Sequence, residues 1–180
     1  MKYLIIAAFI IGLNTSHAKS PRLEVKRPER LVLGKFKFYD FFKKFRCKHT
    51  SSKFKCVEPV RNYDGDTITV NIPNIHELFG NEIPVRLLGI DTAEIRTSDD
   101  CEKDMAERAK LFVETELASA RVIHLYNIER DKYFRIGADV ILDGNSLSKK
   151  LLEENLAYPY EGSTKPDVDW CKPLDEQFDM

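Results

Sequence analysis

The stretch VEPVRNYDGDTITVNI, residues 57–72, has β-branched residues on both sides of the dipeptide Asp64-Gly65. β-Branched side chains favour strands, and Asp-Gly is suited to a tight turn between two strands. The stretch therefore predicts a β-hairpin. It also leaves two carboxylates, Asp64 and Asp66, beside the turn.

The hairpin is followed by further strands and by helices. Apolar residues recur at helical spacing over 101–119, and a second leucine-rich stripe begins near Ser146. The resulting order β-β-β-α-β-β-α predicts an α+β protein, a five-stranded barrel of the OB type with two or three packed helices. Beyond the hairpin, the expected elements are a strand at 83–90, a helix at 101–119, strands at 121–128 and 134–142, and a helix from Ser146.

The first residues have the pattern of a signal peptide. Lys2 precedes an apolar run at 3–13, and Ser16 and Ala18 form the small-x-small arrangement that signal peptidases accept. An uncleaved membrane anchor is the alternative, but the run is shorter than the ~20 residues that span a bilayer. We expect cleavage before Lys19 and export to the periplasm or the exterior.

Length and composition predict one folded domain. The chain has 180 residues, of which 43% are hydrophobic, which is enough for one core. The segment beyond residue 161 is rich in glycine, proline and aspartate and indicates an irregular tail. The expected organisation is a signal peptide at 1–18, a basic aromatic arm at 19–55, the folded domain at 56–161 and the tail at 162–180.

Export changes the interpretation of the four cysteines, because thiols pair in an oxidising compartment. We expect a short loop closed by Cys47 and Cys56, and a second bridge from Cys101 to Cys171 that ties the first helix to the tail. A zinc site of Cys47, His49 and Cys56 is the alternative. It lacks a Cys-x-x-Cys pair and a clear fourth ligand.

Charge is distributed unevenly along the chain. Residues 19–61 hold 14 Lys and Arg against 4 Asp and Glu, whereas residues 62–180 hold 13 against 25. Within the arm, four phenylalanines recur on one helical face. This face could dock on the folded domain, or the basic arm could contact nucleic-acid phosphates or an anionic membrane. The four phenylalanines of this face are Phe38, Phe41, Phe42 and Phe45.

Two further polar blocks interrupt the strands, RLLGIDTAE at residues 86–94 and RDKYFR at residues 130–135. Charges beside buried strands are costly unless they are paired or bind a metal ion. Carboxylate oxygens suit a hard divalent cation. Taken singly, the residues Asp64-Gly65-Asp66 also fit a plain turn, and Arg86 in block 86–94 also fits an ordinary ion pair. Only the three blocks together predict a functional site.

In this order the three blocks resemble the staphylococcal nuclease family. Its signatures are Asp-Gly-Asp-Thr, then Arg-Leu followed by Asp-Thr-Pro-Glu, then Asp-Lys-Tyr-Gly-Arg, on an OB barrel. The resemblance covers roughly Val57 to Tyr160. Two positions depart from the pattern, because Ala93 stands where the family has proline and Phe134 replaces the glycine.

The resemblance implies a calcium-dependent catalytic centre. Asp66 and Asp91 would be carboxylate ligands of Ca²⁺, together with the backbone carbonyl of Thr92. Glu94 would orient or deprotonate the attacking water. The phosphate would be held by Arg86 and Arg135.

The resemblance also implies how substrate is held. Lys132 and Tyr133 match positions that contact a terminal phosphate. Tyr158 and Tyr160 lie near the family's base-stacking tyrosines, in an ambiguous register. Asp64 would support the metal pocket from behind the ligands.

The implied function is a monomeric endonuclease that hydrolyses DNA and RNA with little sequence specificity. The alternative is a noncatalytic OB module that binds nucleic acid or protein. Retention of all five reactive residues favours the enzyme, since a binding module has little reason to keep them. They are Asp66, Arg86, Asp91, Glu94 and Arg135.

Overall fold

The computed structural model describes residues 47–130 and 135–178, and the expected signal peptide and most of the arm lie outside them. No helix in these two ranges is long and apolar enough to cross a membrane. The elements are β1 Lys53–Lys55, β2 Glu58–Asn62, β3 Thr67–Asn71, α2 Glu77–Gly80, β4 Ile83–Leu87, β5 Ile90–Asp91, α3 Asp100–Ser119, β6 Ile123–Arg130, β7 Ile136–Leu142, β8 Asn145–Ser146, α4 Leu147–Glu153, β9 Tyr158–Pro159 and the 3₁₀ helix η1 Leu174–Glu176.

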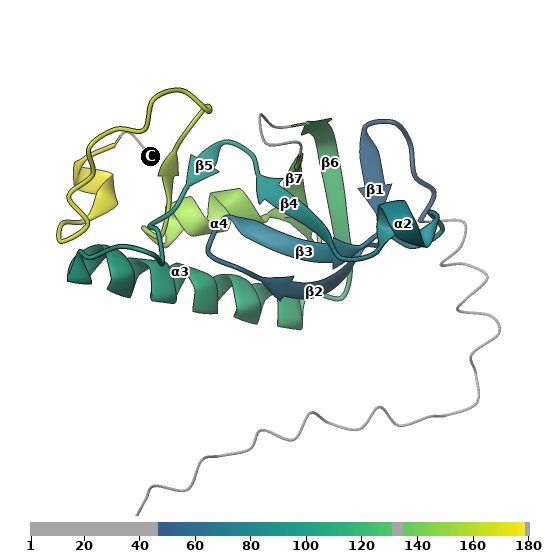
Figure 1. Cartoon of the computed structure of the whole chain (residues 1–180), viewed down its shortest axis with the longest axis horizontal. Coiled ribbons are helices and arrows are strands. Elements are labelled where there is room, and N and C mark those ends of the chain that lie inside the picture. The colour runs from purple at the N-terminus through teal and green to yellow at the C-terminus, as the bar shows by residue number, and fades with distance from the viewer. Residues whose placement is uncertain (1–46, 131–134, 179–180) are drawn as a thin grey trace, which may run out of the picture. The chain divides into compact units, whose positions relative to one another are not determined.

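The predicted hairpin forms one end of a curved mixed sheet (Figure 1). β2 and β3 pair antiparallel, β3 pairs antiparallel with β4, and β4 pairs in parallel with β7. The strand order is β1-β6-β7-β4-β3-β2, with β8 added to β7, while β5 and β9 form a separate two-stranded ladder. The parallel pair brings the block 86–94 beside the start of β7.

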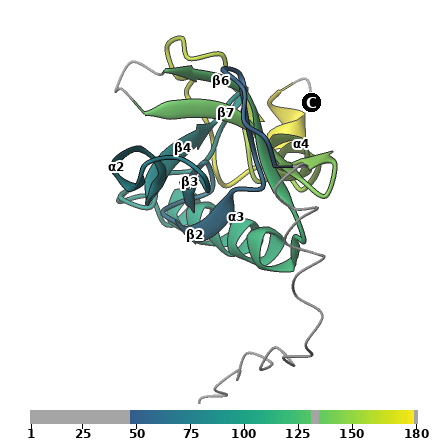
Figure 2. The ribbon, with the colours of Figure 1, turned by 90° about the vertical axis from the view of Figure 1, so that its right-hand side faces the viewer.

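The predicted α+β, OB-like class is confirmed. The five strands expected from the sequence correspond to β2, β3, β4, β6 and β7. The ladders between described residues leave β1 and β2 as the two ends of the sheet, so they do not close it into a continuous barrel. Figure 2 shows its curvature, with β6 and β7 above β2 and α3.

One hydrophobic core joins the sheet to α3 and α4. α3 runs along β2, α4 packs against β7, and the two helices contact each other. Fully buried side chains from the strands, such as Ile68 and Leu125, meet Val113 of α3 and Leu151 of α4. Burial of one such side chain contributes about 1.5–3 kcal/mol. The buried face of α3 includes Ala109 and Leu117, with Met105 and Phe112 half-buried at its edge.

The structure differs from the sequence-based expectation in three places. The strand expected at 83–90 is broken, because Gly89 adopts a positive φ of 76° in the turn between β4 and β5. The short helix α2 was not expected. β1 pairs with β6 although its residues were assigned to the arm, so the folded domain begins before residue 56.

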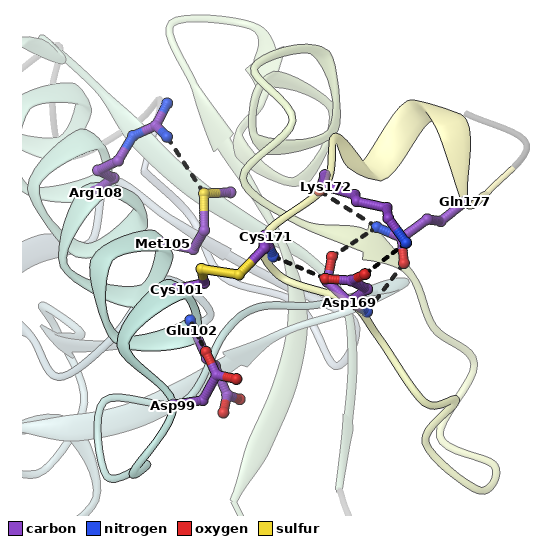
Figure 3. Close-up of a disulfide and its surroundings, with 9 residues drawn as sticks. All are labelled: Asp99, Cys101, Glu102, Met105, Arg108, Asp169, Cys171, Lys172 and Gln177. Carbon is purple, nitrogen blue, oxygen red and sulfur yellow. Dashed lines mark hydrogen bonds and ion pairs between the residues drawn. A yellow bond between two sulfur atoms is a disulfide. The ribbon is translucent and has the colours of Figure 1, made fainter.

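Both predicted disulfides are present, Cys47–Cys56 and Cys101–Cys171. The zinc alternative is wrong, because the two thiols it needs are joined, and His49 contacts the carbonyl of Pro73. The second disulfide anchors the tail at the N-terminal end of α3 (Figure 3). The tail is irregular as predicted, apart from η1.

Candidate active site

The turn before β3 holds Asp66 in a defined position. The Asp64 carboxylate accepts hydrogen bonds from the backbone N–H groups of Asp66 at 3.1 Å and Thr67 at 2.7 Å. The Asn62 side chain donates to the carbonyls of Asp64 and Lys110, which ties the turn to α3. Asp64 therefore shapes the backbone that carries Asp66, while its support of a metal pocket stays a prediction.

Gly65 lets this turn lie directly against α3. A Cβ atom at this position would lie 2.7 Å from the Cβ of Ala109 and 2.9 Å from Cγ2 of Thr92. Both distances are far below a van der Waals contact, so any side chain would push the turn away. The contact with Thr92 also brings the first polar block against the second.

Arg86, on β4, bridges the two aspartates. Its Nη1 lies 2.5 Å from Oδ2 of Asp66, and its Nη2 lies 2.6 Å from Oδ1 of Asp91. Nη2 also donates to the carbonyl of Ile90 at 3.1 Å. One planar guanidinium thus holds two carboxylates from different blocks at a fixed separation.

Asp66 is buried in a polar niche. Its Oδ1 accepts from the Thr67 hydroxyl at 3.0 Å, and its Oδ2 accepts from the N–H and the hydroxyl of Thr92 at 3.4 and 3.3 Å. Burial raises the pKa of Asp66 to about 7, although Arg86 opposes the shift. Burial thus disfavours the charged form of this carboxylate more than Arg86 favours it.

Asp91 is almost completely buried, at 1% exposure. Besides Arg86, it accepts a hydrogen bond at Oδ2 from the Tyr158 hydroxyl at 2.7 Å, and Nζ of Lys165 lies 2.9 Å from the same oxygen. The pairing of β5 with β9 places Tyr158 opposite Asp91. Burial, followed by the bond to Asp91, raises the pKa of Tyr158, so its hydroxyl remains a donor.

The position of Tyr158 corrects its expected role in base stacking. Its side chain is 2% exposed, and its ring stacks on Phe178 with centroids 4.8 Å apart. Trp170 also lies against it, at 5.9 Å between centroids. Because these tail residues cover the ring, Tyr158 supports a carboxylate instead. Tyr160 is half-buried and donates its hydroxyl hydrogen to the carbonyl of Ser163.

Glu94 stands at the open edge of the site, with its side chain 60% exposed. Its backbone N–H donates to the Glu102 carboxylate at 3.2 Å, close to the start of α3. Its own carboxylate lies 2.8 Å from Nζ of Lys165. Ala93, before it, is buried. Glu94 is thus accessible to solvent while Asp66 and Asp91 are not.

Lys165 joins Asp91 to Glu94 and was missed by the sequence analysis. Burial lowers the pKa of Lys165, but the hydrogen bonds that it donates to Glu94 and Asp91 outweigh this, so the pKa lies above its ordinary value. Lys165 lies in a polar, irregular segment, where no hydrophobic periodicity indicates which side chains face the folded domain. The bridge at Cys171 was the one sign that the tail is held against the domain.

The family's sequence model, described as staphylococcal nuclease homologue, matches residues 84–174. The chain belongs to the staphylococcal nuclease family. The matched range includes the blocks 86–94 and 130–135 and extends into the tail.

Two curated relatives from Bacillus subtilis (strain 168) are similar to this family member. The SPbeta prophage-derived endonuclease YokF is 38% identical over 111 residues, covering 58% of this chain and 35% of YokF. Endonuclease YncB is 36% identical over 137 residues, covering 72% of this chain and 61% of YncB. The chain therefore spans less than two thirds of the length of either relative.

The third family block is described only at its ends. Lys132 and Tyr133, expected to contact substrate, and Phe134 lie outside the described residues. Arg135 is half-buried and directly precedes β7. Two residues further on, Gly137 pairs with Arg86 in the parallel register. The topology thus brings the third block to the same part of the sheet as the second.

The residues of the site fit a divalent cation by the chemistry of their donors. Asp66 and Asp91 offer carboxylate oxygens only, which hard cations such as Ca²⁺ prefer. Both contact one guanidinium, so they lie close together, and Thr92 lies beside them. Among described residues, no cluster of three or more His, Cys, Asp and Glu has a metal-binding arrangement. A cation here would therefore need backbone carbonyls, as expected for Thr92, or water.

Proposed function

We propose that this protein is a calcium-dependent endonuclease that hydrolyses phosphodiester bonds of DNA and RNA with little sequence specificity. The main observation behind the proposal is that Arg86 forms ion pairs with both Asp66 and Asp91, while Glu94 is exposed at the edge of the same site. Family membership and two relatives named as endonucleases support the proposal.

The reaction explains why these residue types are grouped. Water attacks phosphorus and gives up a proton to a base, the bond to one ester oxygen breaks, and that oxygen takes up a proton from solvent. Glu94, as an accessible carboxylate, is suited to accept the proton of the attacking water. Negative charge develops on the phosphate oxygens, and the positive charge of the Arg86 and Arg135 guanidinium groups is suited to stabilise it. A bound Ca²⁺ would add Lewis-acid stabilisation of the same charge.

The test is hydrolysis of single-stranded DNA by the wild type and by Glu94→Gln. The wild type should need Ca²⁺ and stop when a chelator is added. Glu94→Gln should lower turnover by about 10²–10⁴-fold, the usual contribution of general acid-base catalysis, because the amide cannot accept the proton.

A matched control is Glu82→Gln, an exposed glutamate that pairs with Arg61 on the sheet surface. It should leave turnover unchanged. Full activity in excess chelator would remove the cation from the proposal, and near-normal turnover of Glu94→Gln would remove Glu94 from the mechanism. Absence of hydrolysis in the wild type, with retained DNA binding, would favour the noncatalytic module.

We also propose that the protein is exported. The two disulfides support this, because such bonds persist mainly in oxidising compartments. N-terminal sequencing of the protein recovered from outside the cytoplasm should begin at Lys19. Recovery only from the cytoplasm, with Met1 retained, would contradict export.

A further inference from the structure

Lys165 contacts two carboxylates of the site at once. Its Nζ lies 2.9 Å from Oδ2 of Asp91 and 2.8 Å from Oε1 of Glu94. A carboxylate oxygen has two lone pairs, and on Oδ2 of Asp91 the donors are Tyr158 and Lys165. A cation that binds this oxygen must therefore replace one of the two.

Of the three side chains that hold Asp91, Lys165 is the easiest to displace. Tyr158 is buried, and the side chain of Arg86 is only 14% exposed, whereas that of Lys165 is 47% exposed. An ammonium group and a divalent cation repel each other when they share a carboxylate. Arrival of the cation thus acts first on Lys165.

The tail keeps Lys165 near the site because it is fixed on both sides of this residue. On one side, the backbone N–H of Tyr160 donates to the carbonyl of Gly89. On the other, Cys171 is bonded to Cys101, and Asp169 is held by hydrogen bonds from Cys171 and Gln177 (Figure 3). Such a tether gives the ammonium a high effective concentration at the carboxylates.

We propose that Lys165 competes with a divalent cation for Asp91, and that its displacement releases Glu94. This inference rests on the proposed function, because it assumes that Asp91 binds the cation. Lys165 then lowers the cation affinity of the site and keeps the general base in an ion pair until the cation is bound. The Cys101–Cys171 bridge sets how strongly Lys165 competes.

The experiment measures the Kd for Ca²⁺ alone by calorimetry on the purified full-length protein, with fluorescence of Trp170 as a second readout. Trp170 is the sole tryptophan and lies on the same tail, against Tyr158. Lys165→Met should bind Ca²⁺ up to about fivefold more tightly, the upper end of the range for removal of a partly exposed charged contact. Its fluorescence change on binding should be smaller than that of the wild type.

The matched control is Lys172→Met. Lys172 is on the same tail and pairs with Asp169 at 2.7 Å, away from the carboxylates of the site. It should bind Ca²⁺ as the wild type does. If Lys172→Met and Lys165→Met increase the Ca²⁺ affinity equally, the effect comes from net charge and the proposal is overturned.

Removal of the Cys101–Cys171 disulfide is a further test that leaves every charged side chain in place. The pair Cys101→Ser and Cys171→Ser should also tighten Ca²⁺ binding, by less than Lys165→Met, and should add nothing when combined with it. If the effects of the serine pair and of Lys165→Met on Ca²⁺ affinity are fully additive, the disulfide does not act through Lys165, and that part of the proposal is overturned. If the serine pair does not fold, Lys165→Gln against Lys172→Gln decides the matter, since glutamine also lacks the charge.

Failure of this inference differs from failure of the proposed function. Unchanged or weaker Ca²⁺ binding by Lys165→Met, in a protein that hydrolyses DNA with Ca²⁺, overturns the competition alone. Absence of Ca²⁺ binding in every variant overturns both.

Discussion

Two regions of the molecule build the site in different ways. The sheet region, from β2 to β5, holds Asp66, Arg86 and Asp91 by strand ladders, by a side-chain-supported turn and by the core. The tail beyond β9 contributes Lys165 without regular secondary structure at that residue. A disulfide and an aromatic stack on Tyr158 hold it there.

The difference indicates which parts of the site are rigid. Ladder bonds and buried side chains act together, so the carboxylates can move only if the core opens. The tail, by contrast, is held by one disulfide and an aromatic stack, so removal of the disulfide loosens it while the sheet stays in place. We therefore expect substitutions in the sheet region to affect both stability and chemistry, and substitutions in the tail to affect the site more selectively.

The largest effect is expected for Arg86→Met. It leaves Asp66 and Asp91 close together and buried without the guanidinium that bridges them, which should lower the free energy of unfolding by about 3–5 kcal/mol. Loss of charge at the phosphate should also reduce turnover by about 10²–10³-fold. Urea denaturation in the presence of chelator and hydrolysis of single-stranded DNA measure the two effects.

The control is Arg61→Met, because Arg61 forms a surface pair with Glu82 in which both side chains are more than half exposed. Such pairs contribute about 0–1 kcal/mol, so its stability and turnover should match the wild type. A similar loss for both arginines would show that the buried bridge has no special role.

A smaller effect is expected when Cys101 and Cys171 are both replaced by serine. The bond joins residues 70 apart, and its removal should cost about 2–4 kcal/mol of unfolding free energy, largely through the entropy of the unfolded chain. Hydrogen exchange should accelerate around Leu174, whose side chain is buried, and stay slow in β3 and β4. Equal acceleration in both regions would contradict the separation of sheet and tail.

The smallest effect is expected for Gly65→Ala. The added methyl group meets Ala109 and Thr92, and such overpacking typically costs about 1–3 kcal/mol. Turnover should fall as well, because Asp66 is the next residue. Ala109→Gly in the same chain should recover part of the stability by making room. No loss in Gly65→Ala would show that the turn is less tightly packed than its distances imply.

Much of the sheet could be predicted from local sequence. The β-branched runs around Asp64-Gly65 predicted β2, β3 and the turn between them, because strand propensity and turn chemistry act over a few residues. Helical spacing likewise predicted α3 and α4 with their buried faces. The break at Gly89 was missed, since the surrounding residues are as apolar as a continuous strand.

The carboxylates and Arg86 were also identified from the sequence, because charged residues beside buried strands are conspicuous. Their grouping in one site agrees with that prediction, while their chemical roles stay predictions. Tyr158 was misinterpreted, since exposure of a ring depends on residues far along the chain. Lys165 was missed for the same reason.

The sequence by itself determined the main strands and helices, the two disulfides and the set of acidic and basic residues around the hairpin, because these depend on local propensity, cysteine pairing and charge. Only the tertiary structure decided that Arg86 bridges Asp66 and Asp91, that Phe178 covers Tyr158, and that Lys165 reaches Glu94. Side chains up to 74 residues apart, those of Lys165 and Asp91, meet there. Such contacts follow from packing and from the path of the tail, which no local pattern encodes.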